Sequence, residues 1–492
     1  MEKIISLLRR KTRVATALAA GTLVFASCAQ DGFDEDERFG SSVTNTAMTT
    51  PTADEITIQQ NVDGTQTVIS WPFVGGAGGY LCTVLDITDA ENPVALNNIQ
   101  DSVIDRCQLA VPREVEHNYT FSIRTLGRAD LNNTDSETTT EVAFNSFTAA
   151  LGTIPDGTDI TEYITNNPMP EEAVETEMAY DLVPGGQYTM TGDVDFGNKL
   201  VQLRSTAADN PATVVLQADA SIMTSTGLSI KNVNFDCSKS KEAFIALSDE
   251  PDESIMGVLS GSQNYYDIQP PASLLLQNCH ITGVNNYFIY DNNKKYCLGT
   301  AIIRDCVVQL TSTEKVSGVI RFQGGFINDL TIENSTFWGI DGADASYFVQ
   351  YNNSGRCDRG GYTSNSITYK NCTFYNVANS GQWGNYNGFA GRNTSYWNMT
   401  NCIFVDCGNN QVPRRYLGGR LNCDNRNFLN NTYMYDGAFE STGGSVAGYD
   451  DSASAIEMNP GFKDAANGDF TVSGSEQIAR GTGDPRWLPA NQ

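Results

Sequence analysis

Histidine, tryptophan and basic side chains are scarce in this chain of 492 residues. It holds two histidines, five tryptophans, and 31 lysines and arginines against 58 aspartates and glutamates, so its formal net charge is −27. Nucleic-acid binding needs a basic face that contacts phosphates. The charge therefore argues against nucleic acid as a partner. It also argues against unassisted binding of a strongly anionic polymer, unless cations cluster locally or a metal ion bridges the two.

Long apolar runs are missing as well, apart from one stretch near the N-terminus. Residues 14–26 are apolar, follow a basic segment and lead into the sequence FASC, which ends at Cys28. This stretch is too short to span a bilayer as a helix. It resembles a bacterial lipobox, which implies a signal peptide over 1–27 and a lipid on Cys28; an ordinary secretory signal before a chance cysteine is the alternative. The acidic tether at 28–50 is similar to the surface-export signal of Bacteroidetes lipoproteins, which implies an outer-membrane anchor.

What the chain does have is an internal repeat. An asparagine or aspartate stands between two short apolar runs, as in ITYKNCTFYNV at 367–377, and recurs at steps of 27 to 46 residues. Self-similarity at such a period is typical of solenoids. The repeated positions are Asn232, Asn278, Asp305, Asn334, Asn371, Asn401 and Asn430.

The repeat predicts a bend at each of these positions. Ile367 and Tyr369 are two residues apart and share one face of a strand. Cys372 and Phe374 also share a face, but with the opposite parity. Both pairs can line one interior only if the chain bends at Asn371, and asparagine tolerates left-handed dihedrals well. Stacked coils would align the amides as a hydrogen-bonded ladder. This geometry predicts a right-handed parallel β-helix, whose three-stranded coils need roughly 20–25 residues.

The twelve cysteines suggest disulfides at first sight, but the repeat argues otherwise. Four of them fill the repeat position that holds valine, serine or asparagine in other coils, which indicates a small interior slot with stacked free thiols. These four are Cys279, Cys306, Cys372 and Cys402. Cys82 and Cys107 lie outside the repeats, on strands expected in opposite sheets, and a bridge between them stays open.

The chain also divides by pattern. Residues 51–149 alternate with a period of two, and carry Trp71 on an early strand and a Tyr-x-Phe-x-Ile strand at 119–123. This segment resembles a fibronectin type III domain, a small Ig-like β-sandwich. Residues 150–180 hold a possible short helix and a proline-rich passage, and are interpreted as a linker and N-terminal cap. Residues 181–492 are assigned to the β-helix with its C-terminal cap.

Three features together resemble a known family. They are the asparagine coils, the segment YDLVPGGQYTMTG at 180–192, and the ending NPGFKDAANGDFTVSGSEQIARGTGDPRW. The combination is similar to Bacteroidetes surface lipoproteins with a pectate-lyase-like right-handed parallel β-helix, and it covers roughly 180–487. The resemblance implies an all-β fold and a glycan held outside one parallel sheet. It implies no particular activity, because this fold hosts lyases, hydrolases and inactive binders.

A second set of aligned strands supplies the candidate glycan contacts. These strands are expected at 287–292, 319–324, 347–352, 388–393 and 415–420. Setting Ile289, Phe322 and Val349 inward leaves aromatic, arginine and amide side chains outward, which suit sugar faces and sugar oxygens. A neighbouring loop adds Trp383, Tyr386 and Arg392. The predicted glycan-binding residues are Arg321, Gln323, Phe348, Gln350, Trp383, Tyr386, Arg392 and Tyr416. Burial of these aromatics is the alternative. Trp397 is assigned to the core, with Tyr396 outward.

No complete catalytic motif is present. A pectate lyase needs an arginine or lysine base, and often Ca²⁺ on clustered aspartates. The segment NQVPRRYLGGR is similar to the Arg-x-Pro-x-x-Arg motif of one lyase group, but Gln411 replaces the first arginine. No carboxylate set shows Ca²⁺ spacing. Asp291 and Asp358 could form a hydrolytic pair, although turn residues look the same. His117 and His280 join no cluster. Catalytic residues and metal ligands are therefore unassigned.

The sequence thus favours a lipid-anchored protein of the outer membrane surface that binds a polysaccharide, with a pectic glycan as one candidate. Its expected partners are the polysaccharide, the membrane through Cys28, and a glycan-import complex of a polysaccharide-utilisation system. No cofactor is implied for binding. The alternatives are a polysaccharide lyase that cleaves a uronic-acid glycan by β-elimination, with Ca²⁺ as its cofactor, and a structural or adhesive surface protein.

Overall fold

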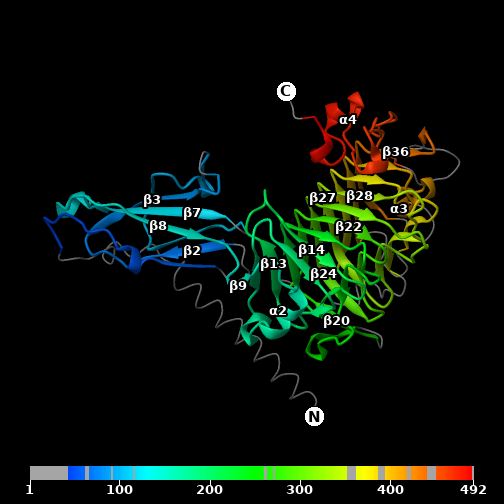
Figure 1. Ribbon diagram of the computed structural model, residues 1–492. Coiled ribbons are helices and arrows are strands. Elements are labelled where there is room, and N and C mark those ends of the chain that lie inside the picture. Colours follow the sequence, from blue (N-terminus) through cyan, green and yellow to red (C-terminus); the bar gives the residue numbers. More distant parts are fainter. Residues whose placement is uncertain are drawn as a thin grey trace, which may run out of the picture. The chain divides into compact units, whose positions relative to one another are not determined.

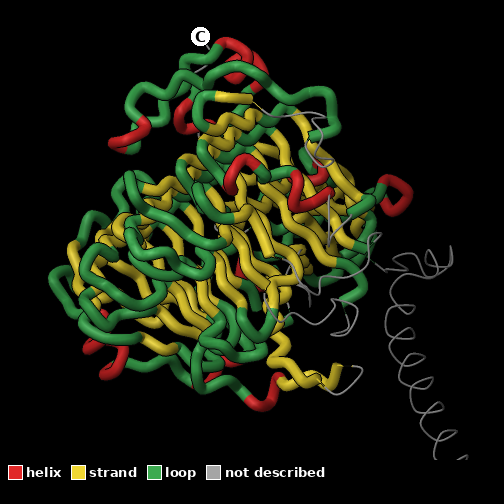
Figure 2. Tube along the Cα trace, turned by 90° about the vertical axis from the view of Figure 1, so that its right-hand side faces the viewer, coloured by secondary structure: helices red, strands yellow, loops and turns green. Residues whose placement is uncertain are grey.

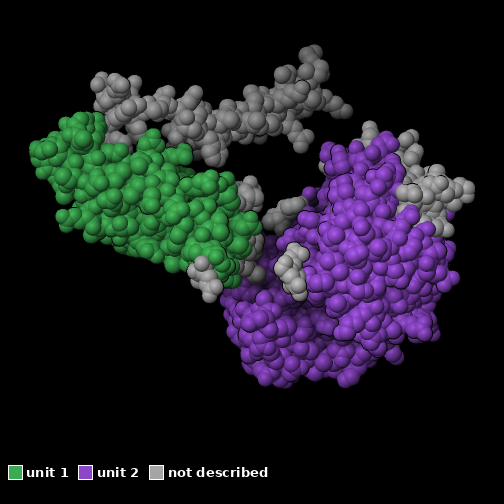
Figure 3. Space-filling view, turned by 90° about the horizontal axis from the view of Figure 1, so that it is seen from above, with its two compact units in different colours: residues 1–147 green, residues 148–492 purple. Residues whose placement is uncertain are grey.

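The computed structural model describes most of the chain beyond residue 42. The described residues are 43–60, 66–89, 92–114, 117–259, 263–269, 272–351, 362–385, 394–417, 423–439 and 450–489. The chain forms two compact units, residues 1–147 and 148–492, which Figure 3 colours separately. The predicted signal peptide and Cys28 lie outside the described residues. Among the helices that are described, none has the length and apolar character needed to cross a bilayer.

The first unit consists of two antiparallel sheets. One sheet contains β1 (Thr57–Gln60), β2 (Gln66–Ser70) and β6 (Gln108–Pro112). The other contains β3 (Ala77–Asp86), β4 (Val94–Ala95), β5 (Ser102–Ile104), β7 (Asn118–Gly127) and β8 (Thr140–Asn145). Short 3-10 turns lie at η1 (Ala53–Glu55), η2 (Leu96–Asn98) and η3 (Ala129–Leu131). Both sheets contribute side chains to a single apolar core.

Trp71 is the centre of this core. Its ring lies 5.4 Å from that of Tyr80 and 5.6 Å from that of Phe121, measured between ring centroids. The predicted inward face of the later strand is confirmed, because its Tyr, Phe and Ile side chains are all buried. Cys82 and Cys107 are not bridged; the sulfur of Cys107 instead lies 3.7 Å from the hydroxyl of Tyr80. Membership of the fibronectin type III family stays a prediction.

The second unit is built from three parallel sheets (Figures 1 and 2). The first contains β9 (Ala150–Ile154), β10 (Met178–Leu182), β13 (Val201–Ser205), β16 (Leu228–Lys231), β21 (Leu274–Gln277), β24 (Tyr296–Arg304), β27 (Phe326–Glu333), β30 (Asn365–Lys370), β33 (Ser395–Thr400) and β35 (Asn425–Leu429). The second contains β11 (Gln187–Met190), β14 (Ala212–Leu216), β17 (Val233–Asp236), β22 (His280–Val284), β25 (Val307–Leu310), β28 (Thr336–Gly339), β31 (Thr373–Tyr375), β34 (Ile403–Val405) and β36 (Thr432–Tyr435). The third contains β12 (Val194–Asp195), β15 (Ile222–Thr224), β18 (Ile245–Leu247), β23 (Ile289–Tyr290), β26 (Ile320–Phe322), β29 (Tyr347–Tyr351) and β32 (Gln382–Asn385).

The order of these strands along the chain defines a coil. The chain visits the first sheet, then the second, then the third, and returns to the first one position further along, as from β10 through β11 and β12 to β13. One apolar core runs through the interior and receives side chains from all three sheets. This unit is therefore an all-β parallel β-helix, whose coils succeed one another from cyan to orange in Figure 1. Its right-handedness remains an expectation from the general rule for parallel crossovers.

Smaller elements decorate the coils. Before and around the first coils lie α2 (Ile160–Asn166) and η4 (Glu171–Val174), in the passage expected to hold a short helix. An antiparallel hairpin of β19 (Met256–Leu259) and β20 (Gln263–Ile268), entered through η5 (Glu253–Ile255), joins the first sheet beside β24. Later coils carry η7 (Gly408–Asn410), α3 (Arg414–Leu417) and β37 (Ala438–Phe439). The first parallel strand, β9 (Ala150–Ile154), begins before residue 181, where the sequence predicted the start of the β-helix.

The repeated asparagines form the corner between the first and second sheets. All seven predicted positions have a left-handed backbone, with φ between +48° and +57°. Their side chains form the predicted ladder in part. Asn278 donates to Asn232 at 2.9 Å, Asn371 to Asn334 at 3.1 Å, and Asn401 to Asn371 at 3.2 Å. Asp305 has no amide to donate and interrupts the series. The bend that allows both flanking runs to face inward is therefore confirmed.

Buried thiols occupy the interior side of this corner. Cys279, Cys306, Cys372 and Cys402 are free and at most 2% exposed, as predicted from the valine and serine found in other coils. Each thiol donates to the backbone carbonyl two residues earlier, for example Cys306 to Arg304 at 3.1 Å. Burial raises the pKa of the Cys306 and Cys372 thiols well above the usual range, so both are protonated at neutral pH.

The last described segment packs along the outside of the second sheet. It includes η8 (Ala465–Asn467), α4 (Ser475–Arg480) and η9 (Pro485–Trp487). Phe470 is fully buried against Trp338 and Tyr375, at centroid distances of 5.8 and 5.6 Å. The C-terminal segment therefore covers the side of the coils, which adds apolar burial that the repeat alone does not supply.

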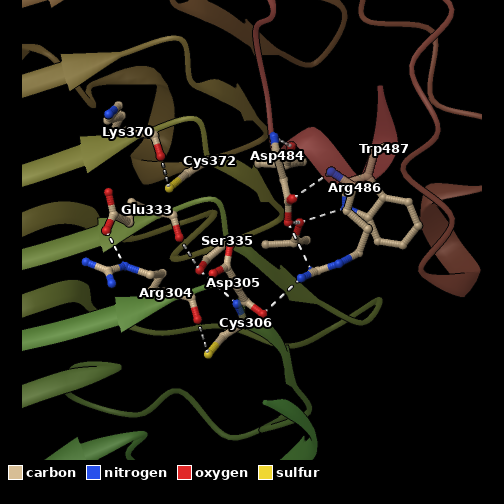
Figure 4. Close-up of polar contacts among 12 residues, drawn as sticks. Arg304, Asp305, Cys306, Glu333, Ser335, Lys370, Cys372, Asp484, Arg486 and Trp487 are labelled. Carbon is tan, nitrogen blue, oxygen red and sulfur yellow. Dashed lines mark hydrogen bonds and ion pairs between the residues drawn. The ribbon is translucent and has the colours of Figure 1, made fainter. Parts of the chain in front are cut away.

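Polar contacts hold the end of this segment in place (Figure 4). Asp484 is 1% exposed; it accepts from Thr336 at 2.8 Å and from the guanidinium of Arg486 at 3.2 Å. Arg486 also donates to the backbone carbonyl of Asp305, and Trp487 donates to Thr336. Burial raises the pKa of Asp484 to about 6, although Arg486 opposes the shift.

Replacing Asn371 tests the corner. We expect Asn371→Ala to lower the free energy of unfolding by about 1–3 kcal/mol, because alanine resists left-handed dihedrals and cannot replace the ladder hydrogen bonds. Asn371→Gly is the matched control, since glycine accepts the backbone angle but also lacks the amide. Urea unfolding followed by circular dichroism measures both. Equal stability of the alanine and glycine variants would contradict the role of the left-handed bend.

Asp484→Asn tests the buried carboxyl. A folded-state pKa above the unfolded value means that Asp484 adds stability below about pH 4 and loses it as pH rises through about 6. The asparagine variant lacks this titration. Its unfolding free energy minus that of the native chain should therefore rise between pH 4 and pH 7, by on the order of 2 kcal/mol. Denaturant titrations at several pH values measure the difference. A difference independent of pH would refute the assignment.

Candidate functional site

The outer face of the third sheet carries the candidate site. Its strands are aligned so that one residue of each points away from the core, in a continuous column across seven coils. From coil to coil this outward column consists of Asp195, Met223, Ala246, Tyr290, Arg321, Gln350 and Asn385. The preceding residues form the inward column, which consists of Val194, Ile222, Ile245, Ile289, Ile320, Val349 and Gly384.

The predicted outward position of Phe348 is wrong. Phe348 and Val349 are both fully buried and both belong to the interior core, so two successive residues of β29 face inward. The register also differs from the prediction, since Ile320 and not Phe322 aligns with Val349. The ring of Phe348 stacks at 4.6 Å on that of Trp383. Phe348 therefore belongs to the core and cannot offer a face to a sugar.

Trp383 is likewise a core residue. Its side chain is fully buried and also meets Phe374 and Phe404 edge-on, at 5.0 and 5.2 Å. The prediction that Trp383 forms a loop platform is wrong, because this tryptophan lies on β32 and points inward. The predictions for Trp397 as a core residue and Tyr396 as an outward residue are confirmed, because Trp397 is fully buried and Tyr396 is 45% exposed.

Three predicted contacts do come together. Arg321 lies on the outward column and donates to the amide oxygen of Gln323 at 3.2 Å, and Gln350 is its neighbour on the next strand. Gln350 is only 8% exposed. The guanidinium carbon of Arg321 lies 5.0 Å from the ring centre of Tyr287 and 5.6 Å from that of Tyr290. Arg321 also donates to the hydroxyl of Tyr287.

The remaining predicted contacts cannot be placed. Tyr386 and Arg392 lie outside the described residues, as does the strand predicted at 388–393. Tyr416 falls in α3 where a strand was predicted, and its side chain is outside what the structure describes. The prediction of a strand that begins at residue 415 is therefore wrong, since residues 414–417 are helical.

An open cleft of about 360 Å³ lies at the other end of the same column. Its floor is apolar and consists of Met223, Ala243 and Ala246, each at most 8% exposed, which pack with Tyr287 and Tyr290. The two tyrosine rings lie 4.6 Å apart and form an aromatic wall, which Arg321 holds through its contact with both rings.

Four carboxylates form the rim of the cleft: Asp193, Asp195, Glu242 and Asp249. The backbone amide of Ser221 donates to Asp193 at 2.9 Å, and the hydroxyl of Ser248 donates to Asp195. Partial burial, together with the charges of Glu242 and Asp195, raises the pKa of Asp193. Asp193 therefore lies among carboxylates whose charges oppose its ionisation.

Hydrogen bonds fix the loops that carry the cleft. Asn286 donates to the carbonyl of Lys241 at 2.9 Å, and Asn292 donates to the carbonyl of Leu247 at 2.8 Å. Asn292 has a left-handed backbone, with φ of +50°, and turns the chain out of the third sheet. These bonds link neighbouring coils, so the tyrosine wall and the acidic rim are held by the regular part of the fold.

Asp291, which was predicted as one member of a hydrolytic pair, has a structural role. Asp291 is fully buried and accepts from the backbone amides of Gly324 and Asn293, at 2.8 and 3.0 Å. It therefore closes a turn, and its proposed partner Asp358 lies outside the described residues. Within the described ranges, no group of three or more acidic, cysteine or histidine side chains is placed to hold a metal ion.

Sequence reasoning missed the cleft itself. Its residues come from the first four coils, where the asparagine phrase that guided the alignment is weakest. The signal that could have found it is the alternation in GDVDF, which places Asp193 and Asp195 two residues apart around the inward Val194. Tyr287 and Tyr290 also flank the inward pair Phe288 and Ile289.

Comparisons with known proteins give families without a function. Three family models match the chain, each described as a domain of unknown function: DUF4992 over residues 1–185, DUF4957 over 186–340 and DUF5123 over 367–487. No curated protein matches. Among solved structures, the chain is similar to the family 28 exopolygalacturonase of Yersinia enterocolitica, with 11% identity over 87% of this chain and 90% of that one and a TM-score of 0.18. A similarity at this TM-score does not bear on the chemistry of the cleft.

Phe348→Ala separates a core role from a surface role. We expect the substitution to lower the free energy of unfolding by about 3–5 kcal/mol, because it removes a buried ring from the aromatic cluster. Tyr396→Ala, on an exposed position, is the control and should change stability by about 0.5 kcal/mol or less. Chemical denaturation of the purified protein measures both. If the two variants were equally stable, the assignment of Phe348 to the core would be untenable.

Proposed function

We propose that this protein binds a polysaccharide in the cleft on the outer face of the third sheet. The observation that carries the proposal is the aromatic wall of Tyr287 and Tyr290 above an apolar floor, bordered by carboxylates. Sugar rings present apolar C–H faces that pack on aromatic rings, while their hydroxyl groups donate to carboxylates. A volume of about 360 Å³ is within the usual range of binding pockets and suits one or two sugar units.

The architecture favours a chain-like ligand. The cleft is open and takes its lining from four successive coils, and the outward column continues beyond it to Arg321, which is partly exposed. Neighbouring strands in a sheet are about 4.8 Å apart, so a glycan that enters the cleft could extend across several coils. Arg321 and Gln323 stay predicted contacts of such a chain, in addition to the role of Arg321 behind the tyrosine wall.

The cellular setting is part of the proposal and is supported by the sequence. A lipid on Cys28 would anchor the protein to the outer membrane with its β-helix exposed to external glycans. In that position it would deliver polysaccharide to an import complex of a glycan-utilisation system.

The lyase alternative finds no specific support in the described cleft. β-Elimination from a uronic-acid glycan needs positive charge near the carboxylate of the sugar and a basic side chain at the reacting carbon. No arginine or lysine is among the residues that line the described cleft. A structural or adhesive role without glycan specificity is the outcome if no polysaccharide is retained.

Hydrolysis is a second candidate, and one observation favours it. Asp193, Asp195 and Glu242 line one cleft, and burial and like charges raise the pKa of Asp193 above those of ordinary carboxyl groups, which suits a division between a proton donor and a carboxylate that activates water. Asp193 would act as the general acid. Release of new reducing ends from a retained polysaccharide, and its loss in Asp193→Asn with retention unchanged, would assign catalysis in addition to binding.

Removing the aromatic wall tests the site. We expect the double variant Tyr287→Ala, Tyr290→Ala to lose about tenfold or more in affinity for a retained polysaccharide, because two ring faces are lost. Native gel electrophoresis in gels that contain a panel of polysaccharides measures retardation. Tyr396→Ala, an exposed tyrosine on the first sheet, is the matched control. Unchanged retardation of the double variant, with its fold intact by circular dichroism, would place the binding site elsewhere.

A further inference from the structure

The charge of the cleft carries an inference about its ligand, and this inference rests on the proposed function. Of the residues that line the described cleft, four are acidic and none is basic. The only cation on the described outward column is Arg321, which is not among the lining residues. Its guanidinium contacts both tyrosine rings and donates to Tyr287 and Gln323. Lys241 precedes Glu242 in the chain but is not among the lining residues.

Burial is the main reason that the pKa of Asp193 is raised, and the like charges around it add to the shift. The carboxyl group of Asp193 experiences Glu242, Asp195 and Asp219 as like charges, which all favour its protonated form. A carboxylate brought into the cleft by a ligand would experience the same field. Like charges placed together in a partly desolvated site oppose binding and so discriminate between ligands.

The same carboxylates suit hydroxyl groups. Of the two oxygens of Asp193, one accepts from Ser221, and the other has no hydrogen-bond partner among the described residues. The Glu242 and Asp249 side chains are exposed at the rim. An ionised carboxylate is an acceptor with no donor, so it pairs with a sugar hydroxyl and not with another carboxylate.

We propose that the cleft selects uncharged polysaccharides and rejects polyuronates through the negative charge of Asp195, Glu242 and Asp249, to which Asp193 adds when it is ionised. A neutral glycan packs its ring face on Tyr287 and Tyr290 and donates its hydroxyl groups to the rim. A uronate unit that occupies the cleft meets these carboxylates, and no cation is among the residues that line the described cleft. De-esterified pectin is accordingly excluded as the ligand of this cleft.

Matched pairs of polysaccharides test the selectivity in the purified full-length protein. One pair is homogalacturonan in its methyl-esterified and de-esterified forms, and another is hydroxyethylcellulose and carboxymethylcellulose. We expect the neutral member of at least one pair to be retained. Its acidic partner should bind with an affinity at least about tenfold lower at low ionic strength. Added salt should narrow the difference, because it screens the repulsion.

Variants locate the cause of the selectivity. The double variant Glu242→Gln, Asp249→Asn should reduce the neutral-to-acidic affinity ratio by about threefold or more, because two of the repelling charges are removed. The control is Glu172→Gln, Asp209→Asn, which alters the net charge of the protein equally at two exposed positions outside the cleft. An equal change in both double variants would assign the effect to overall charge and overturn the proposal.

The two proposals fail in different ways. Stronger or equal binding of the acidic members, lost on removal of the two tyrosines, would overturn the selectivity and leave the glycan site in place. Retention of no member of any pair would overturn both the glycan site and its selectivity. Retention that persists without the tyrosines would overturn the assignment of both to this cleft.

Discussion

A left-handed bend at one residue of every coil is the constraint on which this structure depends. At each bend the strand parity is reset, so that the residues before and after the asparagine can both face the interior. Without this bend, the apolar side chains on one side of each asparagine would point to solvent, and neighbouring coils would have no common core. Backbone preference and hydrophobic burial therefore act at the same position, which is why a single residue type recurs there.

This coincidence explains what the sequence could predict. The corner residues, the buried thiols beside them and the interior position of Trp397 all follow from a local rule, namely the dihedral preference of asparagine combined with the period of a strand. Such a rule needs no knowledge of how long the intervening loops are. The steps between coils vary, yet the corner of each coil carries its own mark in the sequence.

The third sheet lacks such a mark, and the site predictions failed there for that reason. Its strands contain two successive inward residues, such as Phe348 and Val349, and no asparagine marks the place where the alternation is broken. A period of two applied across such a pair assigns one of the two residues to the wrong face. The prediction for Phe348 was wrong in this way, whereas Arg321 was assigned to the correct face. The prediction for Trp383 was wrong for another reason, because the segment taken for a loop is the strand β32. The acidic cleft depends on turns of several coils, whose spacing only the assembled fold reveals.

The position of the C-terminal segment has a consequence for the order in which the second unit folds. Arg486 contacts Asp305, and Asp484 contacts Thr336, across separations of 181 and 148 residues. The coils around these residues can stack on their neighbours first, but the outer side of the second sheet stays uncovered until the segment that carries Phe470 and Asp484 packs against it. The C-terminal segment is therefore the last part of this unit to take its place. Its packing depends on contacts between residues far apart in the sequence, which are slow to form.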